Sequence, residues 1–278
     1  MTLPRIGVFD SGVGGLTVLR AMSEQMPAHY LYFGDTARLP YGTKSADTVA
    51  RYAIGAARFL EAQNIDLLVI ACNTATALAL PQIKQAARVP VIGVVEPGAA
   101  MAAEVSRSRS AIVIATEATV SSHAYRDALR QYGLEAYEKA CPLFVPLVEE
   151  GWIDHPVTEQ VARIYLGEAM AQSSDTADVL VLACTHYPLI APLLRSITPN
   201  HVKIVDSAES TARVVRRLLL ERSPQVESRD QGTSSASAAS DHRSFRFFVT
   251  DSVDKFKRLA TRFLGRQVDH VEHIDLGG

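Results

Sequence analysis

Short apolar runs alternate with longer stretches of helical periodicity along most of the chain, and this alternation constrains the fold more than any other feature. The runs are expected strands, at residues 5–11, 29–35, 65–72, 90–95, 111–116, 178–184 and 202–207. They are almost continuously apolar, as strands covered on both faces should be. Between them, stretches such as 45–63 keep apolar side chains on one helical stripe. The pattern predicts an α/β fold with parallel sheets and helices on both sides.

The last part of the chain has a different composition. Residues 223–243 are rich in Ser and Ala, which predicts a flexible linker or surface insertion. Residues 245–251 then read as a strand, and 252–265 as an amphipathic helix closed by Gly265. The basic residues of this segment are Lys255, Arg258, Arg262 and Arg266. We interpret them as a solvated outer face rather than as a surface that binds nucleic acid.

Size and charge exclude several classes of protein. A length of 278 residues suggests about two domains. The apolar fraction of 47% and charged fraction of 21% are those of a globular protein rather than a disordered one or a coiled coil. A net charge of −2 gives no reason to expect a nucleic-acid partner. Neither a signal-type stretch nor an apolar run of about 20 residues is evident, so we expect a soluble, cytoplasmic protein without a membrane partner.

The three cysteines occur in two kinds of context. Their odd number and wide spacing argue against a disulfide framework and favour a reducing compartment. Cys72 and Cys184 lie 112 residues apart in similar segments, each a buried strand ending in Ala-Cys and followed by a polar turn with Thr. Two similar α/β halves would place both at the strand ends where ligands bind. Cys141 lacks such neighbours and is interpreted as structural.

Two thiols facing each other can invert a stereocentre. A thiolate on one side of a substrate carbon removes a proton, and a thiol on the other side returns one. The alternative for each cysteine is a small buried hydrophobe. A metal site is a second alternative, since Cys184 and His186 could be ligands, but no C-x-x-C or second His pair completes a tetrahedral set. No metal is therefore expected.

Two polar turns follow the first two expected strands. The sequence after Asp10 has glycines for a tight turn, but Thr17 breaks the dinucleotide pattern and no P-loop lysine follows. Asp10 is either a surface carboxylate or a group that binds a substrate ammonium or tunes a thiol. The second turn, at Pro40, Tyr41 and Gly42, is either a plain loop or a carboxylate-binding loop.

Three further segments carry polar groups. Ser45 is expected to cap the helix over 45–63. Thr116 and Thr119 follow a strand and could donate hydroxyls. Glu149 and Glu150 precede the only Trp; one could be functional, but an acidic helix start is the simpler interpretation.

Five motifs in order point to one family. They are D-S-G-V-G-G-L-T-V, F-G-D-T-A-R-L-P-Y-G-T-K-S, A-C-N-T-A-T-A, C-P-L-F-V-P-L-V-E-E-G and L-A-C-T-H-Y-P-L-I. The chain resembles the bacterial glutamate racemases of the cofactor-independent aspartate/glutamate racemase family. The likeness runs from about residue 5 to 207 and resumes in the segment FFVTDS.

The resemblance implies a fold and a set of site residues. The fold would be two similar three-layer α/β/α domains with mainly parallel sheets, related by a pseudo-twofold axis across an active-site cleft. The first domain would combine 1–97 with 208–278, with 223–243 as a flexible insertion, and the second would be 98–207. The implied proton donors and acceptors are Cys72, on D-glutamate, and Cys184, on L-glutamate. Asp10 would assist Cys72, and His186 with Glu149 would assist Cys184, Glu150 being left open in place of Glu149. The implied substrate contacts are Asp10, Ser11, Pro40, Tyr41, Gly42, Asn73, Thr74, Thr116, Thr119, Thr185 and His186.

The implied activity is interconversion of L- and D-glutamate without a cofactor, which supplies D-glutamate for peptidoglycan in the cell wall. A homodimer, usual for the family, and an allosteric cell-wall precursor are left open. Two alternatives remain. The first is a racemase acting on aspartate, but the segments LPYGTKS and PLVEEG favour glutamate. The second is a non-catalytic binding protein such as a topoisomerase inhibitor, but the presence of both cysteines argues against it.

Overall fold

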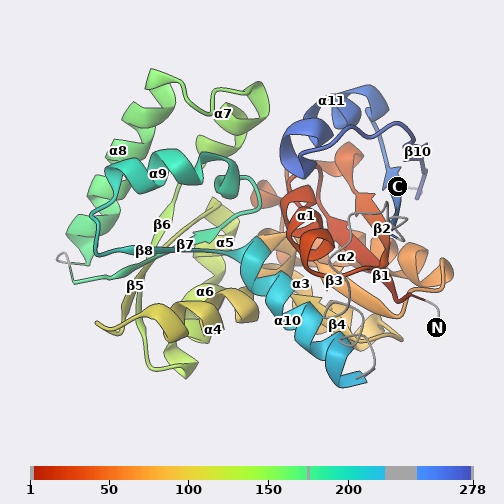
Figure 1. Ribbon diagram of the computed structural model, residues 1–278, viewed down its shortest axis with the longest axis horizontal. Coiled ribbons are helices and arrows are strands. Elements are labelled where there is room, and N and C mark those ends of the chain that lie inside the picture. Colours follow the sequence, from red (N-terminus) through yellow and green to blue (C-terminus); the bar gives the residue numbers. More distant parts are fainter. Residues whose placement is uncertain (1–2, 174–175, 223–242, 277–278) are drawn as a thin grey trace, which may run out of the picture.

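The structure, a computed structural model, describes residues 3–173, 176–222 and 243–276. Its strands form one six-stranded and one four-stranded sheet, and every strand pair is parallel. The two sheets lie side by side, each with its own helices (Figure 1). We call the six-stranded sheet and the helices around it the first half, and the four-stranded sheet with its helices the second half.

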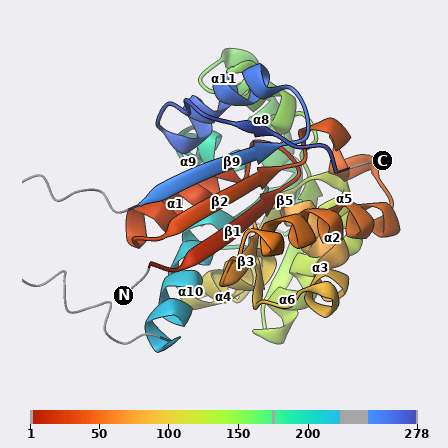
Figure 2. The same cartoon turned by 90° about the vertical axis from the view of Figure 1, so that its right-hand side faces the viewer.

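The strands of the first sheet are ordered β10-β9-β2-β1-β3-β4, and those of the second β6-β5-β7-β8. The first five strands are β1 (Arg5–Asp10), β2 (His29–Gly34), β3 (Leu67–Ile70), β4 (Val91–Gly93) and β5 (Ser110–Ala115). The others are β6 (Glu135–Ala140), β7 (Val179–Ala183), β8 (Lys203–Asp206), β9 (Ser244–Val249) and β10 (Glu272–His273). Figure 2 shows β9, β2, β1 and β3 next to one another.

Helices cover both faces of each sheet. In the first half they are α1 (Leu16–Gln25), α2 (Ala46–Ala62), α3 (Asn73–Ala86), α10 (Ser207–Arg222) and α11 (Val253–Leu264), with the short turns η1 (Thr36–Arg38) and η2 (Tyr41–Thr43). In the second half they are α4 (Val95–Val105), α5 (Glu117–Ser122), α6 (Ala124–Gln131), α7 (Phe144–Glu150), α8 (Pro156–Gln172), η3 (Tyr187–Ile190) and α9 (Ala191–Ile197). Apolar clusters fill the space on either side of both sheets. The predicted α/β/α class is confirmed.

The two halves repeat one strand order. The run β4-β3-β1-β2 in the first half corresponds to β8-β7-β5-β6 in the second. Cys72 follows β3 and Cys184 follows β7, so the two cysteines occupy equivalent places. The chain crosses between the halves twice, from β4 into α4 and from β8 into α10, and α10 packs against both α1 and α4 along the boundary (Figure 1).

Several local predictions are confirmed. The Ser45 hydroxyl accepts a hydrogen bond from the Thr48 amide, an N-cap worth about 1 kcal/mol. Helix α11 buries its apolar stripe, and Gly265 ends it with a φ of 76°. The expected flexible segment at 223–243 lies outside the described residues except for Arg243. Among the helices that are described, none combines the length and apolar character that a membrane span requires.

Candidate active site

Cys72 follows strand β3, which lies between β1 and the edge strand β4, and it caps helix α3. Its sulfur accepts a hydrogen bond from the Ala75 amide at 3.4 Å, and its thiol donates to Ser11 Oγ at 3.5 Å. The side chain is nearly enclosed, with 5% of the residue exposed. Burial, followed by the charge of Asp10, raises the pKa of Cys72 to about 12. The structure therefore favours a protonated thiol at this position.

Asp10 ends the neighbouring strand β1 and is only 2% exposed. Its Oδ2 accepts a hydrogen bond from the Gly12 amide at 2.9 Å, whereas its Oδ1 has no hydrogen-bond partner among the described residues. Burial raises the pKa of Asp10, and the amides of Gly15 and Gly12 and the charge of His186 oppose that rise. A buried carboxylate oxygen without a partner is costly, so it is expected to meet a ligand group in the working protein.

Cys184 heads a chain of polar groups in the second half. Its sulfur lies 4.0 Å from Nδ1 of His186, whose Nε2 lies 3.2 Å from Glu149 Oε1. Burial opposes the imidazolium, but hydrogen bonds with Cys184 and Glu149 and the charges of both prevail and raise the pKa of His186 to about 10. The hydrogen bond with His186 lowers the pKa of Glu149. His186 therefore stands as a cation between the Cys184 sulfur and the Glu149 carboxylate.

The expectation of an acidic helix start at Glu149 and Glu150 is wrong. Both residues lie at the C-terminal end of α7, where the helix dipole disfavours negative charge. Two cations on helix α11 of the first half offset this unfavourable interaction. Lys255 Nζ lies 3.2 Å from Glu149 Oε2, and Arg262 donates to the Glu149 carbonyl oxygen at 3.0 Å. Lys255 and Arg262 are exposed, as expected of a solvated face, and they also contact Glu149 of the second half. Glu149 turns toward His186, while Glu150 is exposed.

The loop after β1 and the start of helix α1, both in the first half, reach the turn that follows Cys184. The Thr17 hydroxyl donates to the Thr185 carbonyl oxygen at 3.0 Å. Gly14 lies so close that a Cβ atom there would stand 2.6 Å from the His186 ring and closer still to Thr185 Oγ1. His186 also acts electrostatically on Asp10. The polar groups around the two cysteines thus converge on one region between the halves.

Hydroxyl groups of the two halves meet at the same boundary. Thr74 Oγ1, on α3, lies 3.0 Å from Thr116 Oγ1 and 3.3 Å from Thr119 Oγ1, on the N-terminal turn of α5. Thr116 also caps α5, as its side chain accepts from the Thr119 amide. These three side chains are among the predicted substrate contacts, and they form one cluster of hydroxyls able to bind a carboxylate.

The predicted loop at 40–42 contributes less than its sequence suggested. The Tyr41 side chain points into the protein, where its hydroxyl donates to the buried Asp35 carboxylate at 2.6 Å. Among the described residues, the side-chain hydrogen bond to Pro40 is internal to the loop, from Thr43 to its carbonyl oxygen. Gly42 approaches the second half, since a Cβ there would lie 3.7 Å from Thr116 Cβ. The loop can therefore offer backbone groups rather than side chains.

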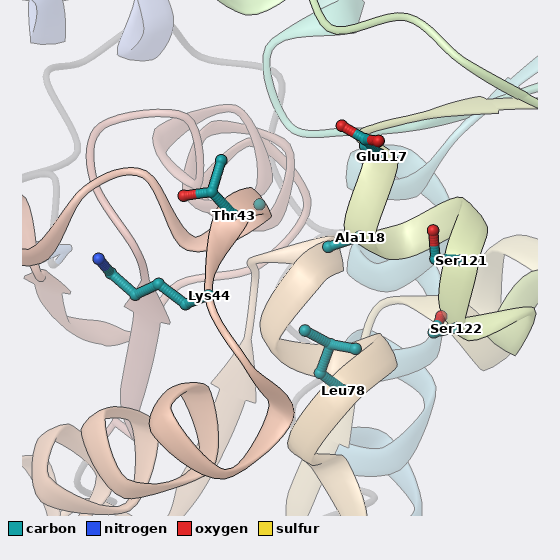
Figure 3. A pocket seen from close by; sticks show the side chains of 8 residues that line it. Thr43, Lys44, Leu78, Glu117, Ala118, Ser121 and Ser122 are labelled. Atoms are coloured by element: carbon teal, nitrogen blue, oxygen red, sulfur yellow. The ribbon is translucent and has the colours of Figure 1, made fainter.

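A hollow of about 450 Å³ lies beside this loop at the boundary of the halves. Figure 3 shows Thr43 and Lys44 on one wall, Glu117, Ala118, Ser121 and Ser122 of α5 on the other, and Leu78 of α3 below them. Because Gly42 and the Thr116 cap of α5 stand at its edge, the hollow adjoins the hydroxyl cluster.

Cys141 is fully buried in the second half and interacts electrostatically with Cys184, but it makes no hydrogen bond to the groups described above. Its thiol lies 3.7 Å from the Lys139 carbonyl oxygen, and burial raises its pKa to about 12. Across 3–173, 176–222 and 243–276, no three His, Cys, Asp or Glu side chains are arranged to hold a metal ion.

Some groups of the site were not anticipated from the sequence. They are Thr17, Asp35 and Lys255, together with Tyr125 and Ser207, which bond to the side chain of Asn73. Asp35 had a local signal, because it directly follows a strand in the segment FGDTARLPYG. The others lie in ordinary helical or strand-to-helix contexts, and only the tertiary fold brings them to the site.

Comparison with known proteins identifies the family. Residues 6–215 match the family described as Asp/Glu/Hydantoin racemase. A curated glutamate racemase from Koribacter versatilis is 60% identical over 99% of this chain and 98% of its own length. The crystal structure of glutamate racemase from Francisella tularensis in complex with D-glutamate is 33% identical, with a TM-score of 0.84 and 99% of both chains covered. Glutamate racemase isoform RacE1 from Bacillus anthracis is 34% identical, with a TM-score of 0.86 and 98% of both chains covered. The resemblance inferred from the motifs is confirmed, and the chain belongs to the Asp/Glu/Hydantoin racemase family of isomerases.

Proposed function

We propose that the protein interconverts L- and D-glutamate without a cofactor, using Cys72 and Cys184 as the two proton carriers. The observation that carries the proposal is the equivalent placement of the two cysteines after β3 and β7, with their polar neighbours in contact across the boundary of the halves. Full-length similarity to curated glutamate racemases supports glutamate as the substrate. In a bacterial cell this activity would supply D-glutamate for peptidoglycan.

The two halves would act as domains on either side of the substrate. Their proposed boundaries, 1–97 with 208–278 and 98–207, fall in the first turns of α4 and α10, next to the two crossings between the sheets. Cys184 would remove the α-proton of L-glutamate while Cys72 returns a proton to the opposite face, and the roles would reverse for D-glutamate. Each turnover moves one proton from carbon to one sulfur and one from the other sulfur to carbon, so no external donor is needed.

The electrostatics of the site favour one resting state of Cys72. Burial and the charge of Asp10 raise the pKa of Cys72 and keep it protonated. Cys72 therefore holds a proton that it can return to the α-carbon when L-glutamate is bound. Processing D-glutamate would require the proton to be on Cys184 instead.

The α-proton of an amino acid is weakly acidic, so charge in the transition state must be stabilised by the protein. The unpartnered Oδ1 of Asp10 is suited to the substrate ammonium group. Hydroxyls of Ser11, Thr74, Thr116, Thr119 and Thr185 and the amide of Asn73 would bind the carboxylates. Both cysteines are only 5% exposed, so the bound substrate would be held away from bulk water, where such interactions are stronger.

The substrate is tested by following circular dichroism with the two enantiomers of glutamate and of aspartate in parallel. We expect interconversion of glutamate in both directions, with aspartate processed at least about 100-fold more slowly. In heavy water the product should carry deuterium at Cα. Faster racemisation of aspartate would assign the other substrate, and no racemisation of either would point to a binding protein.

The pH dependence should report on His186. Because the pKa of His186 is raised to about 10, its positive charge is present below that pH and is lost above it. We expect kcat/KM for L-glutamate to fall as the pH rises through about 10, and the variant His186→Asn to lose this alkaline limb. A wild-type limb centred near the ordinary histidine pKa of about 6.5 would contradict the proposed role of the imidazolium.

A further inference from the structure

A buried trio of polar side chains joins the two halves next to Cys72. The Tyr125 hydroxyl, on α6, donates to Asn73 Oδ1 at 2.6 Å, and Asn73 Nδ2 donates to Ser207 Oγ at 3.1 Å. Tyr125 and Ser207 are fully buried and Asn73 is 3% exposed. Both polar atoms of the Asn73 side chain therefore have a partner outside its own helix, and Nδ2 keeps a second N–H for a substrate.

The trio lies where the chain crosses between the halves. Asn73 directly follows Cys72 in the first half, Tyr125 belongs to the second, and Ser207 begins the return crossing into α10. The Tyr125 ring packs against the other crossing, because a Cβ atom on Gly98 of α4 would lie 3.2 Å from its Cε1. Tyr125 is thus held on one side by α4 and reaches across to the residue beside Cys72.

A corresponding contact exists next to Cys184, with the halves exchanged. Thr17 belongs to α1 in the first half, and its hydroxyl lies 3.0 Å from the carbonyl oxygen of Thr185, the residue directly after Cys184. The same hydroxyl lies 3.0 Å from the Gly14 carbonyl oxygen, so its proton is shared between a local and a cross-boundary acceptor. Thr17 is 7% exposed.

We propose that Tyr125 and Thr17 are a reciprocal pair of positioning residues, in which each half uses one buried hydroxyl to hold the residue that follows the cysteine of the other half. The proposal deepens the function proposed above and rests on it. Tyr125 would set the position of Cys72 relative to the second half, and Thr17 would set that of Cys184 relative to the first. Together they would fix the distance between the two sulfurs.

The physical reason is the short reach of proton transfer. A reacting carbon must lie within about 3–3.5 Å of the sulfur, and a misplacement of about 1 Å can cost on the order of 100-fold in rate. Buried hydrogen bonds are directional, and leaving Asn73 Oδ1 without its donor would cost the desolvation of that oxygen. Loss of the Tyr125 hydroxyl should therefore make the position of the Cys72 sulfur less well defined, and loss of the Thr17 hydroxyl should do the same for the Cys184 sulfur.

The test compares Tyr125→Phe and Thr17→Val with the wild type, using L- and D-glutamate that carry deuterium at Cα. We expect kcat to fall between about 10- and 100-fold in each variant. The isotope effect on kcat should rise mainly for D-glutamate in Tyr125→Phe, because its deprotonation by Cys72 becomes slower, and mainly for L-glutamate in Thr17→Val. Thr17→Ser, which keeps the hydroxyl, should restore kcat to within about threefold of the wild type.

Tyr30→Phe is the matched control. Tyr30 is also a buried tyrosine, but its hydroxyl donates at 3.0 Å to the Met26 carbonyl oxygen within the first half. We expect this variant to keep wild-type kcat and isotope effects. The positioning role is refuted if Tyr125→Phe and Thr17→Val keep kcat within about twofold of the wild type, or if both raise the two isotope effects equally, as general loosening of the fold would. An inactive wild type would instead refute the proposed function.

Discussion

Alanine in place of Cys72 or of Cys184 is expected to abolish interconversion of glutamate enantiomers. Each sulfur serves one face of the substrate carbon in the proposed mechanism, so losing either leaves one face without an acid or base. General acid–base groups contribute about 10²–10⁴-fold to rate, and we expect steady-state racemisation to fall by at least about 10³-fold in each variant. Racemisation is measured by circular dichroism from both enantiomers.

The two variants should differ in the exchange that they retain. The remaining sulfur can still remove the α-proton on its own side and return a solvent proton to the same face. In heavy water, Cys72→Ala should therefore incorporate deuterium into L-glutamate alone, and Cys184→Ala into D-glutamate alone, both without inversion. Residual exchange of this kind also shows that the variant protein is folded and binds substrate.

Cys141→Ala is the control for loss of a buried thiol. Cys141 is at least as enclosed as the other two cysteines, but its thiol bonds within the second half, to the Lys139 carbonyl oxygen. We expect activity to stay near that of the wild type, with a loss of about 1 kcal/mol in the free energy of unfolding from the small cavity. Full interconversion by either Cys72→Ala or Cys184→Ala would remove the basis of the two-thiol mechanism.

Strands that are buried on both faces were predicted from their continuous apolar runs. The runs at 65–72 and 178–184 became β3 and β7, next to β1 and β5 in the centres of the sheets. Strand β6 was missed, because residues Glu135–Ala140 contain three charged side chains and no continuous apolar run. That pattern is typical of an edge strand, where charge discourages pairing with another chain. A search for continuous apolar runs does not find such a strand.

Candidate site residues could be predicted from the sequence where they lie together in one short segment. The segments around Asp10, Cys72 and Cys184 carry their turn residues and polar neighbours in sequence order. Tyr125 and Ser207 could not be found in this way, because a hydroxyl in a helix acquires its role only from the group that folding places opposite it. Glu149 was misread for the same reason: its partners Lys255 and His186 lie far away in sequence and outweigh the local preference against an acidic helix end.

Gly14→Ala is expected to lower kcat by about 100-fold, because the added methyl group would separate the halves at the active site. A Cβ atom at Gly14 would stand 2.6 Å from both Cε1 and Nδ1 of His186, well inside van der Waals contact. The His186 ring has little room to withdraw, since it is bonded to Glu149 and packs edge-on against Phe263 with ring centroids 5.0 Å apart. Overpacking of this kind also costs about 1–3 kcal/mol in the free energy of unfolding.

Gly55→Ala is the control that distinguishes the clash at Gly14 from a general effect of replacing glycine. Gly55 lies within α2, and a Cβ atom there would meet no atom within 4 Å. We expect this variant to keep full activity and to gain roughly 0.5–1 kcal/mol in stability, because alanine is the better helix former. Thermal unfolding and kcat are measured for both variants. If Gly14→Ala keeps wild-type kcat, then the loop after β1 is not in close contact with His186 during catalysis, and the two halves do not meet as described.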